Sequence, residues 1–263
     1  MTLNARLIIM LVVLFIFSSY REAFPFGGCD ENCSSCHKLN VEEAGQLLKV
    51  FDPNATVEAV QQSPSKGLWE LTINTGKNRV IAYLDFSKEN LIIGNIVKIK
   101  TKQNLTETRL TEVNRIDVST ISLKNSLLMG AKNAKTKLIV FTDPECPYCK
   151  KLHEELKALV EKRKNIAIHI VLFPLTKIHP TSYKKSKAII CEKSLKLLDD
   201  AFAGKDIPEP KCETSAVDED IKMAEGLGLT GTPAVVMPDG RVLRGVFKAD
   251  DLIKEIDKNN HKK

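Results

Sequence analysis

The chain has 263 residues, of which 43% are apolar and 27% charged, and its formal net charge is +6. These values are typical of a globular protein, and the length is sufficient for two domains with a hydrophobic core each. The lysines are interleaved with carboxylates and only 6% of the residues are aromatic, so the composition argues against a nucleic-acid-binding surface.

The first residues indicate an export signal. Arg6 precedes an uninterrupted run of eleven apolar residues, Leu7 to Phe17. Such a run is shorter than the ~20 residues that span a bilayer, but it suits the central part of a signal peptide. We expect residues 1–23 to be this signal, with cleavage near Ala23 or retention as an anchor. An exported chain reaches an oxidising compartment, where its seven cysteines are expected to form disulfides.

Residues 24–38 are rich in cysteine and contain Cys29, Cys33 and Cys36, followed by His37. The order Cys33-x-x-Cys36-His37 has the form of a haem-attachment motif, in which both cysteines form thioether bonds and His37 is an axial ligand. The alternative is one disulfide among the three cysteines with a free thiol left over, or a disulfide across a dimer. The sequence leaves these alternatives open.

Residues 39–100 predict a small α+β domain. A helix is expected over Val41–Val50, with Asn40 as its N-cap and Glu43 three residues later. Three strand-like runs separated by turn residues predict an antiparallel meander: Leu68–Asn74, Arg79–Phe86 and Leu91–Lys100. The domain carries no catalytic constellation, and its strand edges favour a role in dimerisation.

Residues 101–136 are polar and rich in Lys and Asn. Their apolar positions recur around Ile121, Leu123, Leu127 and Leu128. This spacing predicts a linker that contains a helix.

Residues 137–260 predict a second domain of strands alternating with helices. In chain order we expect a strand over Leu138–Thr142, a helix over Pro147–Lys162, a strand over Ile166–Phe173, a helical insertion over about 179–228 with helices at Thr181–Ala203 and Val217–Leu227, a hairpin of Ala234–Met237 and Arg241–Gly245, and a closing helix over Asp250–Asp257. This is the element order of a thioredoxin fold with a helical insertion.

The chemistry is expected at Cys146-Pro147-Tyr148-Cys149, where the first strand of this domain turns into a helix. A helix N-terminus stabilises a thiolate, and a thiolate is the species that attacks disulfides. Pro147 suits the first helical position. We therefore expect Cys146 to be the exposed nucleophile and Cys149, one turn deeper, to resolve the mixed disulfide.

Gly231-Thr232-Pro233 precedes a short apolar strand and is the second half of this pattern. In thioredoxin-like folds a cis-proline loop packs against the dithiol, and Thr232 and Pro233 are then expected to hold a substrate strand beside Cys146. The alternative for the cysteines is a zinc half-site completed by Cys33 and Cys36. The separation of about 110 residues exceeds the usual ribbon spacing of roughly 15–20, so the redox interpretation is favoured.

The remaining polar residues of this domain receive structural interpretations. Cys191 and Cys212 straddle the end of the helical insertion, and a structural disulfide is the default for such a pair in an exported protein. His153 lies near the same helix face as the dithiol, but a packed or solvated histidine is favoured over a catalytic one. Asp143 and Glu145 would oppose thiolate formation, and we expect them to have loop and capping roles.

The chain resembles the DsbC/DsbG family of periplasmic disulfide isomerases from about Leu39 to Asn259. The similarity is carried by Val140-Phe141-Thr142-Asp143, Cys146-Pro147-Tyr148-Cys149, Lys151-Leu152-His153-Glu154 and Gly231-Thr232-Pro233-Ala234-Val235-Val236. The Pro147-Tyr148 dipeptide is the DsbG pattern, whereas Cys191 and Cys212 match the structural disulfide of the DsbC branch. The cluster Cys29, Cys33, Cys36 and His37 has no counterpart in the family pattern.

The resemblance implies a periplasmic homodimer whose fold class is an α+β N-terminal dimerisation domain followed by an α/β thioredoxin fold with a helical insertion. It further implies that a membrane reductase of the DsbD type keeps Cys146 and Cys149 reduced, that Cys146 attacks non-native disulfides of misfolded exported proteins, and that no cofactor is required. Tyr148, Thr232 and Pro233 are the expected substrate-binding residues. The alternatives are a reductase of sulfenylated cysteines, a redox partner that carries haem, and a chaperone without thiol chemistry.

Overall fold

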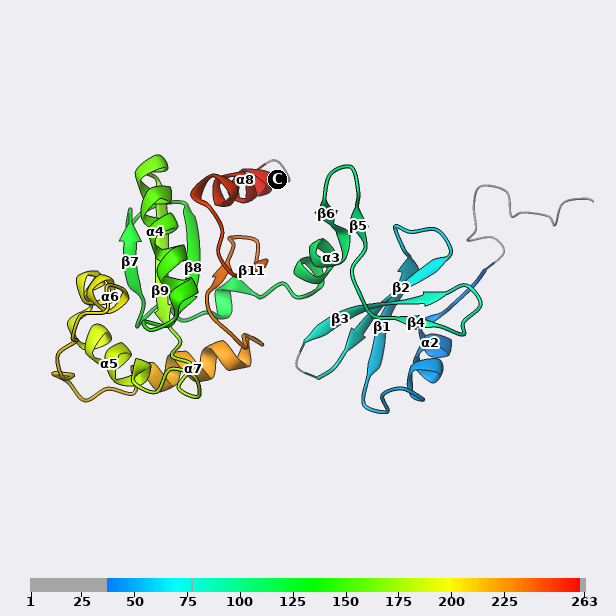
Figure 1. Cartoon of the computed structure of the whole chain (residues 1–263), viewed down its shortest axis with the longest axis horizontal. Coiled ribbons are helices and arrows are strands. Elements are labelled where there is room, and N and C mark those ends of the chain that lie inside the picture. Colours follow the sequence, from blue (N-terminus) through cyan, green and yellow to red (C-terminus); the bar gives the residue numbers. More distant parts are fainter. Residues whose placement is uncertain (1–36, 77, 261–263) are drawn as a thin grey trace, which may run out of the picture.

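The computed structural model describes residues 37–76 and 78–260, which form two domains joined by a short helix, α3 (Leu105–Val113) (Figure 1). The predicted signal peptide and Cys29, Cys33 and Cys36 lie outside the described residues. Within the described ranges, no helix has the length and apolarity needed to cross a membrane.

The N-terminal domain packs one helix against an antiparallel sheet. Helix α2 (Val41–Leu48) is capped as predicted, because the Asn40 side chain accepts a hydrogen bond of 2.8 Å from the backbone N–H of Glu43. The Glu43 carboxylate itself bonds Lys88 at 2.6 Å. The sheet has the order β1-β2-β3-β4, with strands β1 (Thr56–Gln62), β2 (Leu68–Asn74), β3 (Arg79–Asp85) and β4 (Leu91–Ile92).

Two predictions for this domain differ from the structure. Strand β1 was not expected, and a register shift between Val57 and Ala59 explains why, since it breaks the alternation that marks a strand. The predicted strand Leu91–Lys100 is wrong as a single element. After β4 the chain leaves the sheet, and β5 (Val97–Lys98) pairs instead with β6 (Gln103–Asn104) in a separate hairpin.

Helix α3 is fixed to the N-terminal sheet at both of its ends. Near its start, the Thr106 hydroxyl lies 2.6 Å from the buried hydroxyl of Tyr83 in β3. At its end, the Asn114 side chain accepts from the backbone N–H of Arg79 at 2.9 Å and donates to the carbonyl of Arg79 at 2.8 Å. The helix therefore extends the N-terminal domain as one body.

The predicted linker contains a helix, but not where the apolar spacing placed it. The segment around Ile121 to Leu128 has no α-helix, and its end forms strand β7 (Leu127–Gly130). In this strand Leu127 and Met129 are buried and alternate with more exposed neighbours. This is the two-residue period of an edge strand, and β7 pairs with the strand β9 (Ile166–Leu172) of the second domain.

The second domain is built on a sheet of order β11-β10-β8-β9-β7. Its central strands β8 (Thr136–Thr142) and β9 are parallel and almost wholly buried, whereas β10 (Ala234–Val236) and β11 (Val242–Arg244) run antiparallel. Leu138 and Val140 point into one core cluster and Ile139 and Phe141 into the other. Both faces of β8 are therefore covered, which explains its continuous apolar sequence.

Helices cover both faces of this sheet. Helices α4 (Pro147–Lys162) and α8 (Ala249–Asn260) pack on the face of Leu138, and the end of α7 (Ala216–Gly226) and the segment around Ile121 cover the other. The predicted helix over 181–203 is two helices, α5 (Ser182–Glu192) and α6 (Leu195–Phe202). They separate at Lys193, which is left-handed with φ 45°, and Ser194 caps α6.

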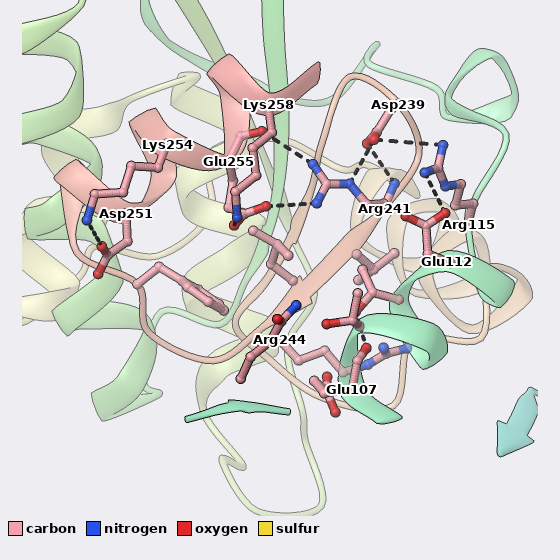
Figure 2. A pocket seen from close by; sticks show the side chains of 16 residues that line it. Glu107, Glu112, Arg115, Asp239, Arg241, Arg244, Asp251, Lys254, Glu255 and Lys258 are labelled. Atoms are coloured by element: carbon pink, nitrogen blue, oxygen red, sulfur yellow. Dashed lines mark hydrogen bonds and ion pairs between the residues drawn. The ribbon is translucent and has the colours of Figure 1, made fainter. Parts of the chain in front are cut away.

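The two domains meet at the turn between β10 and β11. The backbone N–H of Ile116 donates to the carbonyl of Gly240 at 2.8 Å, and Ile116 packs on the core of the second domain. Arg115 lies 3.8 Å from the Asp239 carboxylate, which also binds Arg241 at 2.7 Å (Figure 2). A cavity of about 940 Å³ between α3, β11 and α8 lies beside this network, and neither Cys146 nor Cys149 lines it.

Gly240 is required by this contact, so Gly240→Ala is expected to be strongly destabilising. Its φ is +84°, and a Cβ there would lie 2.1 Å from the carbonyl oxygen of Ile116. Gly204 is a matched control with φ +75° and nothing within 4 Å of its Cβ position. In thermal or urea unfolding, Gly204→Ala should lose about 1–2 kcal/mol from backbone strain, and Gly240→Ala about 1–3 kcal/mol more from the clash. Equal losses would contradict the proposed contact.

Candidate active site

The dithiol lies where β8 ends and α4 begins. Cys146 occupies the N-cap position of α4 with φ −74° and ψ 122°, and Pro147 is the first helical residue. Cys149 lies in the first turn. Both residues are reduced, and they are 5% and 1% exposed respectively. Cys146 is thus the less buried of the two, but it is not the exposed residue that the sequence predicted.

A cis-proline loop packs against the dithiol. The peptide bond between Thr232 and Pro233 is cis, and the Thr232 carbonyl lies 3.7 Å from the Cys146 sulfur. Strand β10 follows directly and pairs with β8, with Ala234 opposite Phe141. This pairing brings two segments that are 86 residues apart in sequence into contact.

The two sulfurs differ in their electrostatic surroundings. A hydrogen bond from the Cys149 thiol, supported by the backbone N–H groups of Cys149 and Tyr148, lowers the pKa of Cys146 to about 6 in spite of burial. Burial raises the pKa of Cys149, and its role as hydrogen-bond donor to Cys146 raises it further. At neutral pH this arrangement favours a thiolate on Cys146 and a thiol on Cys149.

Tyr148 is the exposed side chain of the motif. It is 61% exposed, and the ammonium of Lys151 lies 5.5 Å from the centre of its ring. Its position next to the Cys146 sulfur allows contact with a polypeptide that reaches the dithiol.

The two carboxylates before Cys146 are held by residues that the sequence analysis did not single out. The Asp143 carboxylate is fully buried and accepts from the ring of His179 at 2.9 Å. Glu145 accepts from Lys185 at 2.6 Å and from Thr181 at 2.5 Å. Burial acts to raise the pKa of Glu145, but the hydrogen bonds from Lys185 and Thr181 outweigh it and lower this pKa.

Comparison with known proteins assigns both domains. Residues 123–260, more than half of the chain, match the thioredoxin-like domain family, and residues 37–107 match the disulfide bond isomerase protein N-terminal domain. The chain belongs to the DsbC family of thiol:disulfide interchange proteins.

Individual relatives are distant but cover most of the chain. The thiol:disulfide interchange protein DsbC of Salmonella typhimurium is 27% identical over 190 residues, which is 71% of this chain and 75% of the relative. DsbC of Escherichia coli K12 is 26% identical over 204 residues, covering 76% and 81%. A solved disulfide interchange protein from Neisseria gonorrhoeae is 30% identical, with a TM-score of 0.46, over 53% of this chain and 98% of its own.

Membership of the DsbC family confirms the predicted fold class, an α+β domain followed by a thioredoxin-like domain. It also makes the protein a thiol:disulfide oxidoreductase, as the sequence predicted. The redox interpretation of the Cys-x-x-Cys pair is therefore the one that agrees with the family. Among residues 37–76 and 78–260, no cluster of three or more His, Cys, Asp or Glu side chains is arranged to bind a metal.

Cys191 and Cys212 are joined by a disulfide in the structure, with their Cα atoms 5.6 Å apart. The bond links the end of α5 to the segment that leads into α7. His153 is 3% exposed, donates to or accepts from Asp199 at 2.8 Å, and packs on the ring of Phe202. This is the packed histidine that the sequence analysis favoured.

His37, the proposed axial haem ligand, stacks on Phe86 of the N-terminal domain with ring centres 4.6 Å apart. Its partners in the motif, Cys33 and Cys36, lie outside the described residues. The haem interpretation therefore stays a prediction from the motif.

The charge on Cys146 predicts the pH dependence of its reaction with iodoacetamide. Since only the thiolate reacts, the rate should rise about tenfold per pH unit below pH 6 and level off above about pH 7. Cys149→Ala removes the hydrogen bond that contributes most, so the midpoint should move upward. A midpoint that stays near 6 in Cys149→Ala would contradict this explanation.

The lowered pKa of Cys146 also adds to the stability of the reduced protein against unfolding. An unfolded cysteine has a pKa of about 8.5, above the value of about 6 in the folded state. The stabilisation is therefore complete above about pH 8.5 and is lost as the pH falls through 6.

Removing the second cysteine pair should affect stability and not the dithiol. The disulfide closes a loop of 21 residues, so Cys191→Ala with Cys212→Ala should lower the free energy of unfolding by about 2–5 kcal/mol. The midpoint of Cys146 alkylation should stay where it is. A shift of that midpoint would show that the disulfide supports the active site directly.

Proposed function

We propose that this protein isomerises or reduces non-native disulfides in exported proteins, with Cys146 as nucleophile and Cys149 as resolving cysteine. The observation that carries the proposal is the contrast between the two sulfurs. One has a pKa of about 6 and lies beside a cis-proline loop, and the other is held as a thiol by burial.

The reaction begins when the Cys146 thiolate attacks one sulfur of a substrate disulfide. The substrate S–S bond breaks, a mixed disulfide with Cys146 forms, and the other substrate sulfur leaves as a thiolate. In isomerisation, a different substrate thiolate then attacks the mixed disulfide, forms a new substrate disulfide and restores Cys146. In reduction, Cys149 loses its proton and attacks the Cys146 sulfur, which releases the substrate thiolate and leaves a Cys146–Cys149 disulfide.

The substrate chain is proposed to bind along the cis-proline loop. Thr232 and Pro233 precede β10, and the Thr232 carbonyl already faces the Cys146 sulfur at 3.7 Å. An extended segment that pairs with this loop would bring its own sulfur to Cys146. Tyr148, 61% exposed and two residues after Cys146, would contact the same segment.

We further propose that the protein acts as a periplasmic homodimer and is kept reduced by a membrane reductase of the DsbD type. The N-terminal domain offers a dimer contact at β4, which pairs with β3 on one side. Ile92 in this strand is 43% exposed, and Ile93 directly after it is 70% exposed. An unprotected, apolar strand edge favours pairing with a second chain.

Refolding of a protein with scrambled disulfides tests this function. The unmodified protein should restore the activity of the substrate, and Cys146→Ala should lose this effect because no mixed disulfide forms. Cys149→Ala should accumulate the mixed disulfide, which is seen as a species of higher mass on a non-reducing gel.

The outcomes separate the alternatives. Full activity of Cys146→Ala would exclude thiol chemistry and favour the chaperone that binds its clients without it. The unmodified protein could instead fail to restore the substrate and yet rapidly reduce a sulfenylated cysteine. This result would favour the sulfenic-acid reductase, the activity suggested by the DsbG-like dipeptide Pro147-Tyr148. A Soret band in the absorption spectrum of the purified protein would establish the haem-bearing partner.

A further inference from the structure

Asp143 contacts both cysteines through its backbone. It lies three residues before Cys146 and is 0% exposed. Its N–H points at the Cys149 sulfur at 3.5 Å, and its carbonyl accepts from the backbone N–H of Cys146 at 3.1 Å. Asp143 is therefore hydrogen-bonded to both residues of the dithiol.

The Asp143 side chain is fixed by three donors. Oδ1 accepts from the backbone N–H of Glu145 at 2.8 Å, and Oδ2 accepts from the backbone N–H of Leu175 at 2.7 Å and from Nδ1 of His179 at 2.9 Å. A buried carboxylate is stable only when it is fully hydrogen-bonded. Because an ionised carboxylate donates nothing, the proton in the histidine contact belongs to Nδ1. His179, 19% exposed, is the side chain among the three donors.

Glu145, the residue before Cys146, forms an ion pair with a lysine. Lys185 of α5 donates to it at 2.6 Å, and the two side chains are 27% and 20% exposed. Asp143 and Glu145 lie three residues and one residue before Cys146 in the chain, so a negative charge on either would oppose a thiolate there. Like charges raise the free energy of a thiolate, and opposite charges offset this effect.

We propose that His179 and Lys185 are positioning residues for the dithiol, which hold Asp143 and Glu145 and offset their charge beside Cys146. Both donors come from the chain between β9 and the second turn of α5. The start of the helical insertion thereby sets the redox equilibrium of a motif that lies 30 to 40 residues earlier in the sequence. This inference rests on the proposed roles of Cys146 and Cys149.

The equilibrium with glutathione measures this effect. The reduced dithiol gives two electrons to glutathione disulfide, Cys149 supplies one proton and the solvent supplies the second where Cys146 is already a thiolate, and the products are the Cys146–Cys149 disulfide and two glutathione thiols. The disulfide is uncharged whereas the reduced form carries the thiolate. A more negative surrounding therefore raises the free energy of the reduced form and shifts the equilibrium toward the disulfide.

The experiment compares two variants with two matched controls in the full chain. His179→Leu is matched by His153→Leu, which also breaks a histidine–aspartate contact, of 2.8 Å. Lys185→Met is matched by Lys187→Met on the same helix, where the lysine binds Glu213 at 2.8 Å. The measurements are the equilibrium constant with glutathione, the midpoint of Cys146 alkylation against pH, and the melting temperature.

His179→Leu is expected to shift the equilibrium constant about tenfold toward the disulfide and to raise the alkylation midpoint, since it removes one charge-assisted hydrogen bond. Lys185→Met should shift both in the same direction by about threefold, because its ion pair is partly exposed. The two control variants are expected to lower only the melting temperature. Their equilibrium constants should stay within twofold of that of the unmodified protein. If His179→Leu does not fold, the lysine pair decides.

Equilibrium constants and midpoints that match those of the controls in every folded variant would overturn the inference. The unmodified protein separates this result from a failure of the proposed function. If it reaches no measurable dithiol–disulfide equilibrium with glutathione, the roles given to Cys146 and Cys149 are wrong. If the unmodified protein reaches this equilibrium and the variants have the same equilibrium constant, only the roles of His179 and Lys185 are wrong.

Discussion

The site depends on the pairing of β10 with β8. Three residue pairs join these strands, and they place the Thr232 carbonyl against the Cys146 sulfur. Both parts of the site lie at the same end of this pairing. Strand β8 leads into α4 and the dithiol, and the cis-proline loop leads into β10, whose first residue Ala234 pairs with Phe141 near the end of β8. Neither segment would form a substrate-binding position alone. The core on both faces of β8 keeps the two in register.

A second theme is the balance of charge around one sulfur. The backbone N–H groups at the start of α4 and the Cys149 thiol favour the Cys146 thiolate. The two carboxylates that precede Cys146 would oppose it if their charge were not offset. The Asp143 carboxylate accepts from the backbone N–H groups of Glu145 and Leu175, and it thereby joins the loop before Cys146 to the segment after β9. His179 and Lys185, at the start of the helical insertion, donate hydrogen bonds to these two carboxylates. Under the proposal made above, the insertion supports the chemistry as well as enlarging the fold.

Local patterns predicted those parts of the fold in which local sequence and tertiary packing agree. The limits of α4 follow from Pro147 and the apolar spacing of Leu152, Leu156 and Leu159. Strand β2 follows from the alternation of apolar and polar residues over Leu68–Asn74, and β3 from an apolar run bounded by turn residues. Strand β1 was missed because of its bulge, and β7 was taken for helix because four apolar residues fit either period. The partners of Asp143 could not be predicted, since nothing in a sequence tells which donor reaches a buried carboxylate more than thirty residues away. Burial of that carboxylate at the end of a core strand was the available signal.

The joint between the domains leaves very little free chain. Asn114 is bonded to the N-terminal sheet and Ile116 to the turn at Gly240, so Arg115 alone separates the two attachments. These attachments hold the domain with the dithiol in a fixed position relative to the N-terminal domain. In a pair of chains joined through their N-terminal domains, the distance between the two Cys146 sulfurs would depend on the contact between the domains at Arg115 and Gly240. A client would then have to adapt its own shape to an opening of constant width.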